Sequence, residues 1–387
     1  MNMWESFLSE EELELKKLSR KIAEEKIKPV RDELDRENKF PSELMKEFAD
    51  LGLFGIFVPE EYGGFGFKCM NMVLVVEELS RICGGVAVSF AAVGLGTLPI
   101  LLFGSEEQKK KYLPQIAEGK KLAAFALTEP EAGSDAGAVK TVAVKKGDRY
   151  IVNGVKHFIT NGGEADIYVV FVNTNPKKGM RGISALIVEK GTPGFKFGKK
   201  EDKLGIRASA TRELIFEDAE VPVENLLGRE GMGFRIAMET FDLSRPAIGA
   251  QAVGIAQGAF EEAIKYAKQR KQFGQTIVSF QGIQFMLADM ATKIETARSL
   301  VYWVSRYIDK TNGKAPDIAK YSAMAKVFAS EMAVEVTNKA IQILGGYGYM
   351  KEYPVEKYFR DARITPIYEG TNEIQRLVII RRLIREF

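Results

Sequence analysis

The sequence predicts a multi-domain α+β protein in which helices come first, a compact β domain follows, and long helices end the chain. Three observations predict this order. Residues 1 to about 120 place apolar residues at helical spacing, residues 123–228 carry short β-branched or aromatic runs, and the chain after Gly231 returns to helical spacing. With 387 residues, 46% of them hydrophobic, the chain is long enough for two or three domains with a large core.

The N-terminal region is expected to be helical throughout. Leu13, Leu18, Ile22 and Ile27 give the first helix an apolar face that ends near Pro29. Further helices are expected at residues 41–52, 72–82, 87–103 and 106–118, with a loop at 59–64. The segments 72–82 and 87–103 are largely apolar, so we expect them to be buried.

The middle region is expected to form a β domain. The expected strands are residues 142–144, 150–152, 167–172, 183–188 and 213–216. Asn, Gly, Pro and Lys separate these runs, as turns require. The pattern predicts an antiparallel barrel or sandwich.

The C-terminal region carries two apolar stripes, and each predicts a bundle helix. The first stripe advances in alternating steps of four and three and consists of Ile283, Leu287, Met290, Ile294, Ala297, Val301, Val304 and Ile308. The second consists of Ala325, Phe328, Met332, Val336 and Ala340.

Charge and hydropathy exclude several classes of protein. The 55 basic and 52 acidic residues nearly cancel, so no polybasic field favours nucleic acid or an anionic membrane. We expect no apolar run to reach the roughly 20 residues of a membrane span. The acidic segment 10–14 resembles neither a signal peptide nor a transit peptide. These features predict a cytoplasmic protein with no transmembrane segment.

Cysteine and histidine are too scarce for several kinds of catalytic or structural site. Cys69 and Cys83 are 14 residues apart, which is about 21 Å if the segment between them is helical and too far for a disulfide. With His157 as the one histidine, soft-ligand metal sites are not expected. Nothing around His157 resembles the nucleophile turn of a Ser-His-Asp enzyme. A carboxylate base, a cofactor, or no catalysis remain.

One carboxylate stands in a setting that suits a base. Residues 367–373 read Ile-Tyr-Glu-Gly-Thr-Asn-Glu, so Glu369 lies in a Gly-containing turn before an apolar helix. If this turn is dry, desolvation raises the pKa of Glu369 and makes its carboxylate a stronger general base.

Two polar segments of the middle region allow a ligand-binding and a structural interpretation. The backbone N–H groups of Ala126–Asp135 can hold an anionic or heteroaromatic ligand, or the segment is a polar linker. Phe158 and Thr160 are two residues apart on a strand, so their side chains share a face. They either contact a flat ring of a ligand or belong to the core and the rim of the domain. His157 is expected to point the other way, as a structural or solvent-facing residue.

Three C-terminal motifs are equally open. Asp242 and Arg245 share a helix face as a local ion pair or as a clamp on a nucleotide-bearing substrate. Arg270 either binds a phosphate or places a favourable positive charge at a helix C-terminus. The glycines of Gln342–Gly348 fit a helix cap or a backbone held close to a ligand.

Taken together, these segments resemble the acyl-CoA dehydrogenases, flavin enzymes that oxidise fatty or branched acyl chains. In chain order the matching motifs are the loop 59–64, T-E-P-x-A-G-S-D at 128–135, F-I-T-N-G at 158–162, D-x-x-R at 242–245, R-x-x-F-G at 270–274, the run 342–348, R-D-A at 360–362 and Y-E-G-T at 368–371. The resemblance covers essentially the whole chain.

The resemblance implies an all-α domain at residues 1–121, a β domain at 122–230 and a four-helix bundle at 231–387. It also implies FAD bound between the last two domains, and a homotetramer built as a dimer of dimers. Phe125, Leu127, Thr128, Gly133, Ser134, Phe158, Ile159 and Thr160 would line the flavin. Phe158 stands where the family often has Trp, so it lacks the indole donor.

The remaining binding residues are likewise implied by the resemblance. Arg270, Gln281, Gln342, Gly345 and Gly346 would bind FAD from the neighbouring subunit, and Gln272, Phe273, Ile343 and Leu344 are further cofactor-binding candidates. Thr371 and Asn372 would lie near the flavin pyrophosphate at a helix N-terminus, and Glu373 is a further cofactor-binding candidate. Ser134, Asp242, Arg245, Tyr368 and Gly370 would contact the acyl-CoA.

The implied reaction is the FAD-dependent α,β-dehydrogenation of a fatty or short branched acyl-CoA to the trans-2-enoyl-CoA. Glu369 would remove the α proton, the β hydrogen would leave as hydride to flavin N5, and electron-transferring flavoprotein would accept the electrons. Ser244 stands where some relatives place the base, which favours Glu369. The alternatives are an acyl-CoA oxidase that uses oxygen and a non-catalytic protein that binds acyl-CoA or nucleotide.

The acyl chain length is not fixed by these motifs. The segment 91–102 contains Gly94, Gly96 and Pro99 and falls where relatives form the floor of the acyl pocket. Its glycines either leave room for a medium or longer chain or serve helix packing.

Overall fold

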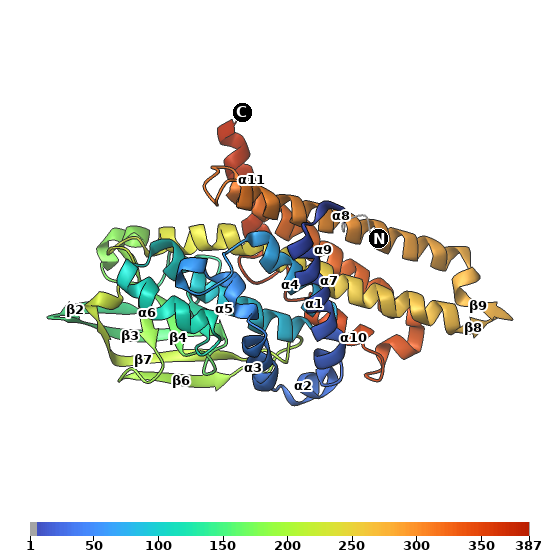
Figure 1. Cartoon of the computed structure of the whole chain (residues 1–387), viewed down its shortest axis with the longest axis horizontal. Helices are drawn as coiled ribbons and strands as arrows, with labels where there is room; N and C mark the ends of the chain where they lie inside the picture. Colours follow the sequence, from blue (N-terminus) through green and yellow to red (C-terminus); the bar gives the residue numbers. More distant parts are fainter. Residues whose placement is uncertain (1–5, 387) are drawn as a thin grey trace.

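The computed structural model describes residues 6–386, which fall into three consecutive groups of elements (Figure 1). The N-terminal helices are α1 (Glu10–Ile22), α2 (Arg31–Glu37), α3 (Ser42–Asp50), α4 (Cys69–Ser80), α5 (Gly84–Phe103) and α6 (Glu106–Ala117). The middle strands are β1 (Ala123–Ala126), β2 (Val142–Lys146), β3 (Arg149–Thr160), β4 (Ile167–Asn173), β5 (Ile183–Glu189), β6 (Phe195–Lys200) and β7 (Thr211–Pro222). The C-terminal elements are α7 (Gly233–Gln269), β8 (Lys271–Gln272), β9 (Gln275–Thr276), α8 (Gln281–Lys310), α9 (Ile318–Leu344), α10 (Val355–Ala362) and α11 (Asn372–Glu386). The predicted multi-domain α+β architecture is confirmed.

The inner face of α1 is more polar than its sequence suggests. Ile22 is buried as predicted, but Leu18 is exposed, which corrects the predicted apolar face. Lys16 points inward instead and lies 3.5 Å from Glu77 and 3.4 Å from Glu78 of α4. A buried ion network therefore joins the two helices, and the apolar periodicity of α1 could not indicate it.

Helix α5 corrects the expectation that no apolar run reaches the length of a membrane span. It has 20 residues, and an 18-residue window within it has a mean hydropathy of 2.2, so by length and composition it could cross a membrane. In the fold, 72% of that stretch is buried inside the protein. The helix packs against α4, α7 and β1.

The two cysteines lie at the two ends of the segment that consists of α4 and the turn after it. Cys69 begins α4, whereas Cys83 follows the end of α4 at Ser80 and precedes α5. Both thiols are buried and free. The expected absence of a disulfide is confirmed, although the segment between them is not one continuous helix.

The middle sheet is curled and mixed. Its strand order is β1-β4-β2-β3-β7-β6, with β5 on the other edge of β4. The pairings of β1 and β2 with β4 are parallel, so the sheet is not wholly antiparallel as predicted. Strands β1 and β6 were not predicted, since each is short and weakly patterned.

Strand β4 explains why its sequence shows no alternation. Ile167, Val169 and Phe171 face the core shared with the helices, whereas Tyr168 and Val170 face a second core enclosed by the sheet. A strand buried on both faces reads as a continuous apolar run. The helices therefore cover one face of the sheet, and the sheet curls around its own core on the other.

The long C-terminal helices run side by side away from the sheet (Figure 1). In α8 the predicted stripe is buried from Leu287 to Ile308. In α9 the predicted Phe328 is exposed, whereas the other members of its stripe are buried. The hairpin β8–β9 lies at the end of these helices far from the sheet, and α11 projects outward at the C-terminus (Figure 1).

Candidate active site

The candidate base stands in a strained turn between α10 and α11. Glu369 has φ +50° and Gly370 has φ +88°, so two successive residues are left-handed. Gln375 Nε2 holds the turn by donating to the carbonyl oxygens of Glu369 at 3.2 Å and Gly370 at 3.1 Å. Thr371 Oγ1 accepts from the N–H of Ile374 at 3.3 Å and so caps α11. The turn and the helix start predicted around Glu369 are both present.

The carboxylate of Glu369 lies against α7. Ser244 Oγ donates to Oε2 of Glu369 at 2.8 Å. Burial raises the pKa of Glu369 to about 7, and it outweighs the hydrogen bond from Ser244 and the positive charges of Arg245 and Lys326, which all lower that pKa. A carboxylate in this environment is a stronger base than one in water.

Glu369 faces a pocket of about 620 Å³ between the sheet, α5, α7 and its own turn. Most of the predicted flavin and substrate residues line it, and these are Phe125, Leu127, Thr128, Gly133, Ser134, Phe158, Ile159, Thr160, Arg245, Tyr368 and Gly370. Segments far apart in the sequence are therefore brought together around one carboxylate. Helix α5 adds Val88, Ala91, Ala92 and Leu95.

A buried ion pair joins two walls of this pocket. Lys156 Nζ donates to Glu129 Oε1 at 2.7 Å and to the carbonyl oxygen of Leu127 at 3.0 Å. The same carboxylate accepts the N–H groups of Lys140 at 2.6 Å and Thr141 at 3.0 Å. The segment after β1 is thereby fixed to β3. No motif in the sequence indicated this pair, although a lysine within a strand and the glutamate of T-E-P were visible.

A β-bulge aims Phe158 into the pocket. The register of β3 against β7 shifts between Lys156 and Ile159, and Phe158 has φ +57°. The alternation of side chains is lost there, so the rings of His157 and Phe158 touch, with centroids 3.9 Å apart. This corrects the expectation that the two rings point to opposite faces.

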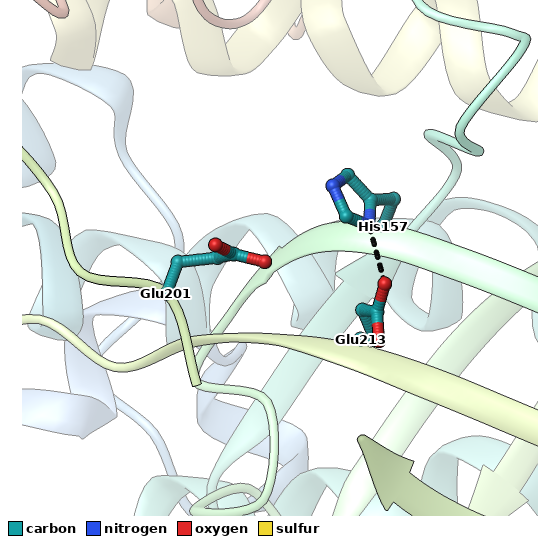
Figure 2. Close-up of side chains that lie close together, drawn as sticks. All are labelled: His157, Glu201 and Glu213. Carbon is teal, nitrogen blue, oxygen red and sulfur yellow. Dashed lines mark ion pairs between the residues drawn. The ribbon is translucent and has the colours of Figure 1, made fainter. Parts of the chain in front are cut away.

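His157 belongs to a small polar cluster on the sheet (Figure 2). Its Nδ1 lies 3.1 Å from Glu213 Oε1, and the carboxylate of Glu201 points toward the same space. Their ligand atoms lie within 4.8 Å of one another, close enough for a cation. Glu213 already pairs with the imidazole, and Glu201 lies 3.3 Å from Lys199 Nζ. Each carboxylate of the cluster therefore has a basic side chain beside it within the protein.

The predicted pair of Asp242 and Arg245 forms on α7, and it leaves one N–H of Arg245 without a partner. Arg245 Nη1 donates to Asp242 Oδ1 at 2.9 Å. Arg245 is buried at the pocket wall, and its Nε has no hydrogen-bond partner among residues 6–386. An unpaired buried donor costs free energy, so this N–H of Arg245 is available to a ligand. Asp242 lies outside this pocket and opens onto a neighbouring hollow with Arg235 and Arg382.

Tyr368 anchors the base turn from the other side. Its hydroxyl donates to Gln251 Oε1 of α7, and Gln251 Nε2 donates to the carbonyl oxygen of Gly84 at 3.0 Å. The turn is thereby tied to α7 and to the start of α5. Gln251 was not indicated by the sequence, because a single glutamine in an apolar helix carries no motif.

A second set of predicted residues lies elsewhere. Arg270, Gln272, Ile343, Leu344, Gly345 and Gly346 line a separate hollow of about 470 Å³. Gln281 and Gln342 are exposed, and Phe273 is 95% exposed at the tip of the β8–β9 hairpin. One chain therefore does not bring this set to the pocket of Glu369.

The residues after the base turn divide between core and surface. Asn372 is buried against α9, where its Oδ1 accepts from Lys326 Nζ at 2.9 Å and its Nδ2 donates to Ser330 Oγ at 3.0 Å. Glu373 is exposed at the start of α11. Lys326 and Ser330 were missed by the sequence analysis. Their only signal is two polar residues, four apart, on a largely apolar helix.

The glycines of α5 serve packing. A Cβ on Gly96 would lie 2.5 Å from the backbone nitrogen of Ala124 in β1, and one on Gly94 would lie 2.6 Å from the ring of Phe57. Neither glycine lines the pocket of Glu369. Of the two interpretations of this segment, helix packing is the one that the structure supports.

The pocket suits the flat ring of a flavin. Phe158 presents a largely bare aromatic face there, with 59% of its surface exposed. Thr128, Ser134 and Thr160 place hydroxyl groups on the same walls. An aromatic face bordered by hydrogen-bonding groups can stack on and orient a heteroaromatic ring.

Comparisons with known proteins agree with this arrangement. Models of the N-terminal, middle and C-terminal domains of acyl-CoA dehydrogenase match residues 9–120, 124–219 and 231–384. An acyl-CoA dehydrogenase of Bacillus subtilis is 52% identical over 378 residues, 97% of this chain and 99% of that protein. An acryloyl-CoA reductase (NADH) of Anaerotignum propionicum is 51% identical over 380 residues, 98% of this chain and 95% of that protein.

Solved structures give the same result. Butyryl-CoA dehydrogenase of Megasphaera elsdenii has a TM-score of 0.95 at 47% identity, covering 98% of this chain and 99% of that one. A chain in the structure of electron transferring flavoprotein of Acidaminococcus fermentans has a TM-score of 0.95 at 52% identity, with the same coverage. An acyl-CoA dehydrogenase of Bacillus anthracis complexed with FAD has a TM-score of 0.91 at 40% identity, covering 98% of this chain and 68% of that one.

Proposed function

The chain belongs to the acyl-CoA dehydrogenase family of FAD-dependent enzymes, and on this premise we propose that it converts a short-chain acyl-CoA to the trans-2-enoyl-CoA with Glu369 as the base. The observation that carries this proposal is the position of Glu369. Glu369 faces the pocket from a fixed turn, with a pKa raised by burial, whereas Asp135, which also lines the pocket, is exposed. The pocket walls around it are those that the family motifs form.

Glu369 removes the proton α to the thioester carbonyl. That proton is weakly acidic, so the base must be strong and the negative charge that develops on the carbonyl oxygen must be stabilised. The backbone N–H of Glu369 takes part in none of the backbone hydrogen bonds within residues 6–386. It is therefore free to donate to that oxygen. A single residue then supplies both the base and one donor of the oxyanion site.

FAD, when bound, supplies the acceptor for the β hydrogen, which leaves as a hydride. Phe158 would stack on the flavin ring, and Thr128, Ser134 and Thr160 would hydrogen-bond around it. The Lys156–Glu129 pair keeps these walls at a fixed spacing. Fixed spacing matters because the reacting atoms must be held in contact distance.

The acyl-CoA would be held from α7 and the loop after β1. Arg245 offers its unpaired Nε–H at the pocket wall, and Asp242 fixes the guanidinium group through Nη1. Ser134, on the loop after β1, lines the same pocket. This arrangement suits the polar pantetheine part of the substrate, with the acyl group directed toward Glu369.

Two observations favour a short acyl chain. The space beside Gly96 and Gly94 of α5 is occupied by β1 and by Phe57, so these glycines do not widen the floor of the pocket. A solved relative, 47% identical, is a butyryl-CoA dehydrogenase.

The exposed second set around Arg270 supports FAD binding across a subunit contact in a homotetramer, because one chain leaves that set away from Glu369.

The electron acceptor is proposed to be electron-transferring flavoprotein. Its support is the likeness, at 52% identity, to a chain in the structure of such a flavoprotein from Acidaminococcus fermentans. The acryloyl-CoA reductase relative favours one alternative, the same chemistry run toward reduction. Oxygen uptake during turnover would instead indicate an acyl-CoA oxidase.

The experiment is a visible-spectrum titration of the purified holoenzyme, without oxygen, with butyryl-, octanoyl- and palmitoyl-CoA. Bleaching of the flavin band by butyryl-CoA at the lowest concentration supports the proposal. Preferential bleaching by palmitoyl-CoA would contradict the short chain, and a colourless protein that FAD does not restore would contradict the enzyme itself. Steady-state assays with electron-transferring flavoprotein, oxygen or NADH then separate the three electron partners.

A further inference from the structure

Lys326 of α9 is a buried lysine with no assigned role in the reaction. Its side chain is fully buried. Its Nζ donates to the carbonyl oxygen of Gly370 at 3.0 Å and to Asn372 Oδ1 at 2.9 Å. Both acceptors are neutral, and a buried ammonium group is costly unless an opposite charge compensates it. The charge on Lys326 therefore needs a partner beyond its hydrogen bonds.

Glu369 carries a charge that can compensate that of Lys326. It precedes Gly370, whose carbonyl oxygen Lys326 holds. Burial lowers the pKa of Lys326 to about 7 and raises that of Glu369 to about 7, and in each case the charge of the other group acts against the effect of burial. Two buried groups whose burial disfavours both charges can each be retained because they compensate one another.

The other charges around Lys326 come from three elements. Arg245 on α7 lowers the pKa of Lys326, whereas Glu331 on α9 and Glu373 on α11 raise it. Arg245 already pairs with Asp242 at 2.9 Å, and Glu331 pairs with Arg376 at 2.6 Å. Glu373 is exposed to solvent, so among the buried charges of this group those of Lys326 and Glu369 are the ones left without an ion-pair partner of their own.

The same lysine fixes the backbone that carries the base. Lys326 and Ser330, one helical turn apart on α9, hold Asn372 from two sides. Lys326 and Gln375 both donate to the carbonyl oxygen of Gly370. The left-handed conformation of Glu369 and Gly370 is unfavourable for a free chain, so these contacts keep the base in place.

We propose that Lys326 is a positioning residue for the α-proton base, whose buried side chain anchors the Gly370–Asn372 turn and places a positive charge at the turn that carries the Glu369 carboxylate. This inference rests on the proposed role of Glu369. It assigns Lys326 no contact with substrate or flavin.

The test compares Lys326→Met and Lys326→Gln, which remove the charge, with Lys326→Arg, which keeps it, and with Ser330→Ala, which removes only a neutral contact to Asn372. FAD content and thermal stability are measured first. The pH dependence of kcat/KM is then recorded with butyryl-CoA, because its acid limb reports the base of the free enzyme. The Gln variant retains hydrogen-bonding capacity, so it remains informative if the Met variant does not fold.

At equal FAD content, both neutral variants should move the acid limb to higher pH by about one unit, which is about a tenfold loss of rate on that limb. Lys326→Arg and Ser330→Ala should keep the wild-type limb. The proposal would be overturned if the acid limb of the neutral variants lay at the wild-type pH. It would also be overturned if the acid limb of the Arg variant shifted as far as that of the Met variant. Failure of the proposed function shows differently, since the wild-type enzyme would then not be reduced by any acyl-CoA.

Discussion

Ser244 Oγ donates a hydrogen bond to Glu369 Oε2 across 2.8 Å, which joins α7 to the turn that carries the base. A hydroxyl group can serve here only as a donor to the carboxylate. It therefore favours the ionised form of Glu369 and orients it at once.

Ser244→Ala should weaken the enzyme most at low pH. Loss of a hydrogen bond to a charged group raises the pKa of Glu369, so the acid limb of kcat/KM should move upward by about one unit. FAD content should not change, because Ser244 does not line the pocket. Ser244→Thr retains the hydroxyl group and is the matched control. An Ala variant with an unshifted limb would show that the contact does not act on the base.

The wild-type enzyme should lose activity as the pH falls through about 7. Burial raises the pKa of Glu369 to about 7, and the ionised carboxylate is the active form. Activity is therefore present above this pH and falls tenfold per unit well below it. Rapid mixing of holoenzyme with butyryl-CoA between pH 5.5 and 9 measures the rate of flavin reduction directly. A limb centred near the pKa of an exposed glutamate would contradict the dry environment of Glu369.

Phe158→Ala should release FAD without unfolding the protein. The side chain is 59% exposed, so its loss should cost little folding free energy. Loss of an aromatic stacking partner should weaken FAD binding by roughly tenfold. Phe158→Trp, the residue that the family often has here, should bind FAD at least as tightly. Equal FAD affinity in the Ala variant, measured by flavin fluorescence, would argue against a stacking role.

Two glycines should respond to alanine in opposite directions. Gly96→Ala places a Cβ 2.5 Å from the backbone nitrogen of Ala124 and should destabilise the protein by about 1–3 kcal/mol. Gly282→Ala, in α8 with open space around it, should stabilise it by about 0.5–1 kcal/mol. Denaturant unfolding of both variants measures the difference. A neutral Gly96→Ala would reopen the interpretation that this glycine leaves room for substrate.

Much of the fold was predictable because burial dictates periodicity. The stripe from Leu287 to Ile308 faces the core of the bundle, and each of its apolar steps is visible in the sequence. Strand β4 was found as a continuous apolar run. Leu18 and Phe328 were assigned to the core and are exposed. Their helices bury polar or small residues instead, and a count of apolar positions cannot detect this.

The site was predictable where its residues form local motifs. The turn of Glu369 and the wall residues around Phe158 meet at one pocket, as the family motifs imply. Lys156 and Lys326 were missed because their partners are distant in the chain, as in the pairs Lys156–Glu129 and Lys326–Asn372. The contact between His157 and Phe158 was missed because a bulge ended the strand alternation.

The central claim is that Glu369 is the base, and Glu369→Gln tests it most directly. Glutamine keeps the size of the side chain and an oxygen that can accept from Ser244, so FAD and butyryl-CoA should bind within a few-fold of the wild-type affinities. Mixing this holoenzyme with butyryl-CoA in the absence of oxygen should leave the visible flavin band unbleached, whereas the wild-type band disappears. Bleaching of the Gln variant at near the wild-type rate would contradict the assignment of Glu369.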